Sequence, residues 1–145
     1  MSWVFEAQTK IYSRVSGILR SKLANQYKDE SGNTTFNVTQ DNAPPTNPKF
    51  PTVYITFLGA MERGQTLDGT SVNAVNMTIE VHVKTSKAQG VRENNKVAWE
   101  VTDAFKTLGF TATMPNIPTS NTNGIYESVS RYSRIIGQGD VLYTV

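Results

Sequence analysis

His82 is the one histidine in this sequence, and its ordinary pKa near neutrality suits it to proton transfer or metal binding. A zinc or iron site needs further His or Cys ligands, and the chain contains no cysteine. A histidine-based nucleophilic triad needs an exposed nucleophile, and no Gly-x-Ser-x-Gly pattern occurs. We therefore expect a structural or surface role for His82, no metal or cofactor site, and no enzymatic activity.

Two other patterns resemble functional motifs but are incomplete. Glu100 and Asp103 lie three positions apart on a predicted helix, which makes them neighbours. Without a third convergent acid or a histidine, we interpret them as part of a solvated helix face. Gly137-x-Gly139 lacks a third glycine and a following helix, so it indicates a turn and not a phosphate-binding loop.

Arg131 and Arg134, in a predicted late strand, are the best candidates for a functional role. One interpretation is ordinary cross-strand pairing with acids such as Glu80 or Glu127. The other is an ion pair between subunits, or a surface that lines a channel. The sequence leaves both interpretations open.

The element that positions Glu80 and His82 is a long strand that turns directly into a helix. Over residues 75–83 the odd positions are apolar and the even positions are polar, which predicts a strand with one buried face. Ser86 is a suitable helix cap, and Gly109 stands where a helix would end. Apolar residues follow a 3.6-residue period between them: Val91, Val97, Ala98, Val101, Ala104, Phe105 and Leu108. We expect this strand and helix to form the core.

Further elements are predicted on both sides of this pair. They are a helix over about Val4–Tyr27, a short edge strand at Phe36 and Val38, a strand at Thr52–Leu58, another at Phe110–Met114, a long one at Ile125–Ile136, and a last short strand at Val141–Val145. The segment Gly59–Ser71 is predicted as a long projecting loop. Such loops often contact partners, so Arg63 and Asp68 within it are candidate contact residues.

The strand at Ile125–Ile136 has apolar and polar residues on both of its faces. Tyr132, Arg134 and Ile136 share one face, while Arg131 and Ile135 lie on the other. Either the strand is covered on both sides, by a helix and by a neighbouring subunit, or a β-bulge resets its register.

The length and the charge of the chain limit the classes of protein to consider. Its 145 residues fit a single domain over 1–145. A net charge of +2, from 14 basic and 12 acidic residues, does not suit a dedicated nucleic-acid binder. No apolar run approaches the ~20 residues of a membrane span. The order of elements predicts an α+β domain, with a mostly antiparallel sheet of about four to five strands and two helices packed on one face.

The chain resembles a known family over nearly its full length, through element order and short patterns. These patterns are Phe50-Pro-Thr-Val-Tyr-Ile55, the strand Asn76–Lys84, the helix end Phe105-Lys-Thr-Leu-Gly-Phe110, and Ser130-Arg-Tyr-Ser-Arg134. In these features it resembles the tail terminator, or tail completion, proteins of long-tailed bacteriophages.

The resemblance implies a non-enzymatic structural virion protein of the tail and neck, assembled in the host cytoplasm. Such proteins form a hexameric ring that ends the tail tube and joins it to the head connector or stopper protein. DNA passes through the lumen without specific binding, and no cofactor or membrane is involved. From their places on the long loop and the strand faces, we take as candidate interface residues Arg63, Asp68, Glu80, His82, Arg131 and Arg134. The alternatives are another neck component, such as a head–tail stopper or adaptor, and a small ligand-binding or regulatory α+β domain.

Overall fold

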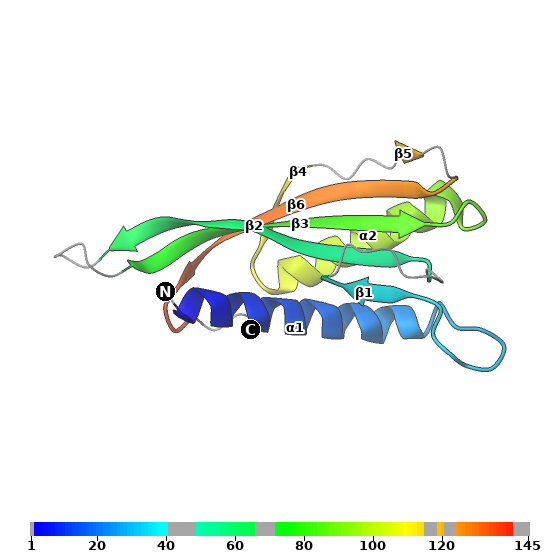
Figure 1. The fold of residues 1–145 in the computed structure, drawn as a ribbon, viewed down its shortest axis with the longest axis horizontal. Helices are drawn as coiled ribbons and strands as arrows, with labels where there is room; N and C mark the ends of the chain where they lie inside the picture. Colours follow the sequence, from blue (N-terminus) through cyan, green and yellow to red (C-terminus); the bar gives the residue numbers. More distant parts are fainter. Residues whose placement is uncertain (1, 41–48, 66–71, 115–118, 121–123, 141–145) are drawn as a thin grey trace.

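The computed structural model describes residues 2–40, 49–65, 72–114, 119–120 and 124–140. These residues form two helices and six strands: α1 (Ser2–Ala24), β1 (Asn37–Thr39), β2 (Thr52–Gln65), β3 (Val72–Thr85), α2 (Gly90–Thr107), β4 (Thr111–Met114), β5 (Thr119–Ser120) and β6 (Tyr126–Gly137). The strand order is β1-β2-β3-β6-β4, and β5 also pairs with β6. Only the β1–β2 pair is parallel among these. Both helices lie on one face of the sheet (Figure 1), so the predicted α+β class is confirmed.

The core lies between that face of the sheet and the helices, and β3 and α2 contribute to it as predicted. The odd-numbered residues of β3 from 75 to 83 are at most 1% exposed. They meet a buried stripe on α2 that includes Val97, Ala98, Val101, Ala104 and Phe105. We call this covered face of the sheet the inner face and the opposite one the outer face. Alternation in the strand thus separates a packed surface from one that carries polar groups.

The ends of α2 differ in how well the sequence predicts them. Gly109 has a φ of +81°, and the amide of Phe110 donates to the carbonyl of Phe105, so the helix ends as expected at a left-handed glycine. Ser86 does not cap the helix. Its hydroxyl accepts from the amide of Gln89 at 3.3 Å and closes the turn before the helix, which begins at Gly90. Val91, predicted on the apolar stripe, is 47% exposed.

The register of β6 decides between the two explanations for its mixed faces. It pairs with β3 from Ala74↔Gly137 to Thr85↔Tyr126 without a shift, so the predicted bulge in this strand pair is wrong. The irregularity lies at the other edge, between Ala112 and Met114 of β4. Tyr132 and Ile136 are buried on the inner face, while Ile135 on the outer face is 60% exposed. A covering neighbour on the outer face remains a prediction.

The hairpin of β2 and β3 is longer than predicted. The expected loop Gly59–Ser71 is wrong over residues 59–65, because β2 continues to Gln65, and its remaining residues 66–71 lie outside the described residues. The pairing survives through register shifts between Phe57 and Gly59 and between Glu62 and Gly64. We call residues 61–65 of β2 and 72–76 of β3 the arm, and Figure 1 shows its end extending past the N-terminus of α1.

The remaining predictions concern short or terminal segments. The edge strand at Phe36 and Val38 is confirmed as β1, and both side chains are buried. The first helix is confirmed with slightly earlier bounds, as α1. The last strand predicted at Val141–Val145 lies outside the described residues.

Candidate interaction surfaces

The outer face of the sheet brings together three of the residues singled out in the sequence. Register places Glu80 of β3 opposite Arg131 of β6, and Lys84 opposite Glu127. His82 lies between these two rows. The even positions of β3, which alternation predicted to be polar, therefore share one surface with the odd positions of β6.

These side chains form a continuous series of polar contacts, which we call the outer ion chain: Arg131, Glu80, His82, Glu127 and Lys84. Arg131 donates from Nε to Oε2 of Glu80 at 2.8 Å, and Nε2 of His82 lies 2.7 Å from Oε1 of the same carboxylate. On its other side, Nδ1 of His82 is 3.6 Å from Oε1 of Glu127. Nζ of Lys84 is 3.5 Å from Oε2 of that carboxylate. Cross-strand pairing, one of the two interpretations of Arg131, is thus confirmed.

Glu80 is the centre of this series. Partial burial raises the pKa of its carboxyl, but hydrogen bonds from His82 and Arg131, together with the charges of both, outweigh burial, so the pKa of Glu80 lies below its ordinary value. The carboxylate is therefore held in its ionised form. Because its lone pairs already accept from two donors, it is poorly placed to act as a general base toward a further group.

Arg134 belongs to a different environment. It lies on the inner face of β6, opposite Met77, and its Nη2 donates to both carboxylate oxygens of Asp140 at 3.1 and 3.2 Å. Cross-strand pairing with Glu80 or Glu127 is therefore wrong for this residue, because its acid comes from the turn that follows β6. Its guanidinium packs against Gly109, where an added Cβ would lie 3.3 Å from Nε. Arg134 thus ties that turn to the end of α2.

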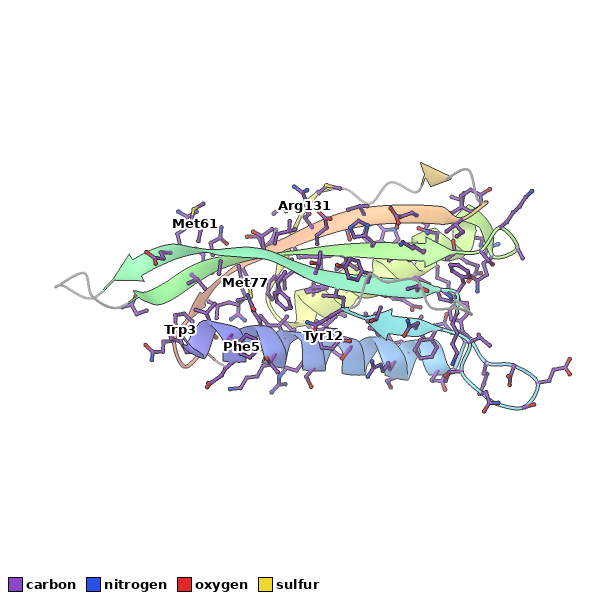
Figure 2. The ribbon with its side chains drawn as sticks, viewed as in Figure 1. Trp3, Phe5, Tyr12, Met61, Met77 and Arg131 are labelled. Carbon is purple, nitrogen blue, oxygen red and sulfur yellow. The ribbon has the colours of Figure 1, made fainter. Side chains whose placement is uncertain are left out.

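The arm carries Arg63, one of the two remaining predicted contact residues. Arg63 is exposed on β2, next to the exposed Met61 and Glu62. Figure 2 shows Met61 on the hairpin, at the end of the molecule where Trp3 of α1 lies, and further from Tyr12. Asp68 lies outside the described residues.

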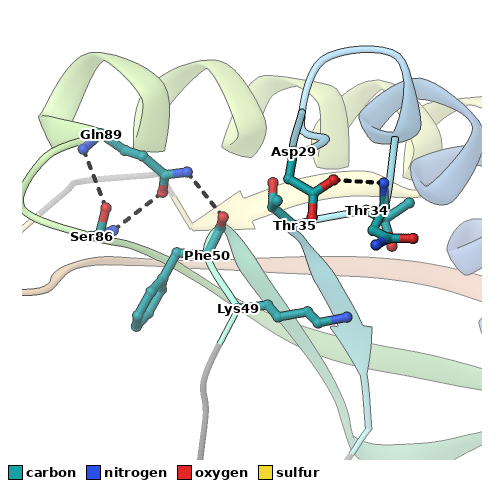
Figure 3. A pocket seen from close by; sticks show the side chains of 8 residues that line it. Asp29, Thr34, Thr35, Lys49, Phe50, Ser86 and Gln89 are labelled. Carbon is teal, nitrogen blue, oxygen red and sulfur yellow. Dashed lines mark hydrogen bonds between the residues drawn. The ribbon is translucent and has the colours of Figure 1, made fainter. Parts of the chain in front are cut away.

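A hollow of about 730 Å³ at one end of the sheet is a candidate ligand site. Its lining comes from three separate connections: Asp29, Asn33, Thr34, Thr35, Lys49, Phe50, Ser86 and Gln89. Several of its polar groups are already engaged locally (Figure 3), since Asp29 accepts from the Asn33 amide at 2.8 Å and Gln89 donates to the Phe50 carbonyl at 2.9 Å. These bonds order the connections and leave few convergent groups for a ligand.

A group of hydroxyls lies in the core, where it has a structural explanation. The hydroxyl of Tyr132 lies 2.7 Å from Thr102 Oγ1 and accepts from Ser130 Oγ at 3.0 Å. Burial raises the pKa of Tyr132 more than these hydrogen bonds lower it. The phenol therefore stays neutral and satisfied inside the sheet–helix interface.

Across the described ranges, no three His, Cys, Asp or Glu side chains come together in a way that could hold a metal ion. Neither α1 nor α2 is long and apolar enough to cross a membrane.

Trp99 is an exposed residue that the sequence reasoning did not single out. It is 57% exposed on α2, on the side opposite the buried stripe. The signal was present in the helical period, because the stripe that includes Val97, Ala98 and Val101 leaves position 99 facing away from the core.

No protein-family model matches the chain, and comparison with curated proteins finds no significant match.

Proposed function

We propose that this chain is a structural protein of the phage neck, a tail terminator that assembles as a homo-oligomeric, hexameric ring. In this proposal the ring ends the tail tube and joins it to the head connector or stopper protein. The family resemblance supplies the idea, and the arm is the single observation that supports it most strongly. A ring subunit needs an element that reaches beyond its own core to a neighbour.

The arm combines paired strands with exposed side chains. A two-stranded ribbon is marginally stable by itself in water, and the arm becomes two-stranded past Ala74, where the pairing of β3 with β6 ends. Met61, on the β2 side of the arm, is 66% exposed. Apart from the buried Val75, the described side chains of the arm add little apolar burial to their own chain, so the stability of the arm depends on the covered part of the hairpin. A contact with another subunit or with the tube would supply the missing burial.

The outer ion chain supports the part of the proposal that concerns DNA. A lumen that passes DNA has to avoid binding its phosphates strongly, because each cation that pairs with a phosphate adds affinity. On the outer face Arg131 is paired with Glu80, and Lys84 with Glu127. Cations that are already neutralised by fixed acids suit a lumen wall. The same face would also suit an interface between subunits, where charge pairs set the register.

Tail tubes assembled without a terminator provide the test. We expect the purified chain to bind the tube end as a ring, visible by negative-stain microscopy, and to stop further polymerisation. Native mass spectrometry would give the number of subunits. A chain that remains monomeric and never associates with tubes would refute the proposal.

Substitutions of the predicted contact residues sharpen this test. Replacing Arg63 and Asp68 together by Ala should reduce head–tail joining while the circular dichroism spectrum and the unfolding midpoint stay unchanged. Lys28→Ala, an exposed position in the turn after α1, is the matched control and should join normally. Normal yields of infectious particles from the double variant would contradict a role for these two side chains.

A further inference from the structure

The exposed side of α1 is strongly basic. Four of the five charged residues of this helix are basic, and all four are exposed: Lys10, Arg14, Arg20 and Lys22. The fifth is Glu6, so four basic and one acidic residue give α1 a net charge of +3, against +2 for the whole chain. Arg20 has a structural explanation, since its Nη2 donates to the carbonyl of Val38 at 3.0 Å. Within the described part of the chain, Lys10 and Lys22 form no ion pair.

A groove of about 750 Å³ lies between this side of α1 and the C-terminal end of α2. Arg14 and Lys22 line it from α1, and so does the half-buried Ile18. Leu108 lines it from the end of α2. No acidic side chain is among the described residues that line it. The groove therefore combines apolar surface with two cations of the same sign.

The shape of the groove suits a helix. No heavy atom lies within 4 Å of the Cβ that a substitution would add at Gly17, so space is open above the backbone of α1 there. Ser13 and Ser21, one turn away on either side, are also small and line the same groove. A row of small residues lets the ridge of another helix enter and pack closely. From Ser13 to Lys22 the groove follows α1 for about 14 Å, which is about two and a half helical turns.

Charge decides which helix fits. A partner that covers Ile18 and Leu108 also removes water from Arg14 and Lys22, and this costs free energy unless acidic groups replace the water. A second copy of this chain does not supply such a helix, because neither described helix has an excess of acidic residues. DNA would satisfy the cations through its phosphates but would leave the apolar part of the groove uncovered.

We propose that the groove between α1 and the end of α2 binds an acidic, amphipathic helix of another protein. The apolar face of that helix covers Ile18 and Leu108, and its carboxylates pair with Arg14 and Lys22. Lys10, one turn before Arg14, extends the same basic surface. This inference concerns the helical side of the domain and does not depend on the proposed ring, for which the arm and the outer face supply the contacts.

A synthetic helix tests the groove directly. The probe is a fluorescently labelled peptide with Leu along one helical face and Glu on both sides of that face. Fluorescence anisotropy should show binding that weakens with added salt. Arg14→Glu and Lys22→Glu should each weaken it about tenfold or more, because each replaces an attractive charge by a repulsive one. Lys87→Glu makes the same change of charge in the exposed turn before α2, so it is the matched control and should bind as the wild type does.

Gly17→Leu separates the shape of the groove from its charge. The added side chain fills the space that a partner helix needs and leaves every charge unchanged. Leucine is a better helix former than glycine, so the variant should fold at least as well as the wild type. We expect the affinity for the peptide to fall about tenfold or more, whereas Gly17→Ala, which leaves most of the space open, should bind normally. An unchanged affinity in Gly17→Leu would mean that the peptide meets only the cations, and it would overturn the inference.

A second peptide and a DNA competitor identify other modes of binding. A scrambled peptide of the same composition, without an apolar face, should bind more weakly than the amphipathic one. Equal affinities, or no binding of either peptide to the wild-type chain, would contradict the proposal. Double-stranded DNA of mixed sequence should not displace the amphipathic peptide, and displacement would mean that the surface binds phosphates instead.

Sedimentation velocity of the chain alone tests a second copy as the occupant. Self-association that Lys22→Glu abolishes would place another copy in the groove and overturn the inference. The proposed function can fail separately. If the peptide binds as expected but the chain never caps a tail tube, the groove assignment stands and the terminator function fails. If Lys22→Glu and the wild type bind the peptide equally while both cap tubes, the groove assignment is wrong and the terminator function stands.

Discussion

The two halves of the β2–β3 hairpin belong to the same two paired strands, but their side chains differ in burial. In the covered half, Ile55 and Ile79 lie under the helices and are at most 1% exposed. In the arm, Met61 and Glu62 are exposed although the strands remain paired. The difference lies in what covers the strands and not in their hydrogen bonds.

This contrast shows which interactions stabilise the fold. A backbone hydrogen bond contributes only about 1 kcal/mol net, because folding exchanges it for bonds to water. Burying a large apolar side chain contributes about 1.5–3 kcal/mol. The covered half therefore determines stability, and the arm is left free to change its surface without unfolding the domain.

The largest expected effect comes from Phe105 in the covered half. Its ring is fully buried, stacks on Tyr132 at a centroid distance of 4.4 Å and meets Phe110 edge-on at 5.5 Å. Phe105→Ala should lower the free energy of unfolding by about 3–5 kcal/mol, measured by urea denaturation. Met61→Ala in the arm should change it by no more than about 0.5 kcal/mol. Similar losses for both variants would remove the distinction between the two halves.

The ion pair of Arg134 and Asp140 and the outer ion chain should differ in how much they stabilise the fold. Asp140→Asn removes the charge partner of Arg134, whose side chain is only 20% exposed, so we expect a loss of about 1–3 kcal/mol. Glu127→Gln in the outer ion chain, with 33% of the side chain exposed, should cost less than about 1 kcal/mol. Urea denaturation of both variants gives the ranking, and a larger loss for Glu127→Gln would contradict it.

The sequence predicts the covered half well because burial there has a regular period. Alternation over residues 75–83 identifies the inner face of β3, and the helical stripe identifies the inner face of α2. The positive φ of Gly109 confirms the helix end, since an L side chain would be strained there. Pairing of Glu80 with Arg131 is among the alternatives that the sequence predicts, because acidic and basic residues stand at alternating positions of both strands.

The same sequence periods do not predict the arm or the role of Arg134, for physical reasons. Strand pairing past Leu58 passes through register shifts, which break the period that predicts a strand. Arg134 shares a face with Tyr132, and no local pattern reveals that an acid six positions later closes back on it. Trp99 lies on the side of α2 opposite the buried stripe, where the helical period predicts exposure but gives no sign of a contact.

The smallest effect concerns Glu80 and depends on pH. Because the pKa of this carboxyl is lower in the folded chain than its ordinary value of 4.5, its interactions stabilise the fold fully above that value. Their contribution is lost as the pH falls through the lower folded pKa, where the protonated group no longer pairs with Arg131 and His82. Glu80→Gln should therefore be less stable than the wild type near neutral pH, by less than about 1 kcal/mol.

The two stability curves should converge on acidification below the ordinary pKa, which thermal unfolding between about pH 3 and 7 would show. Glu62→Gln is the matched control, since Glu62 lies exposed on the arm, and its curve should run parallel to that of the wild type throughout. If only the Glu80→Gln curve converges with that of the wild type, the pH-dependent stabilisation comes from the outer ion chain, which lies on the covered half of the hairpin. A constant difference at all pH values would instead mean that the substitution acts through packing and not through charge.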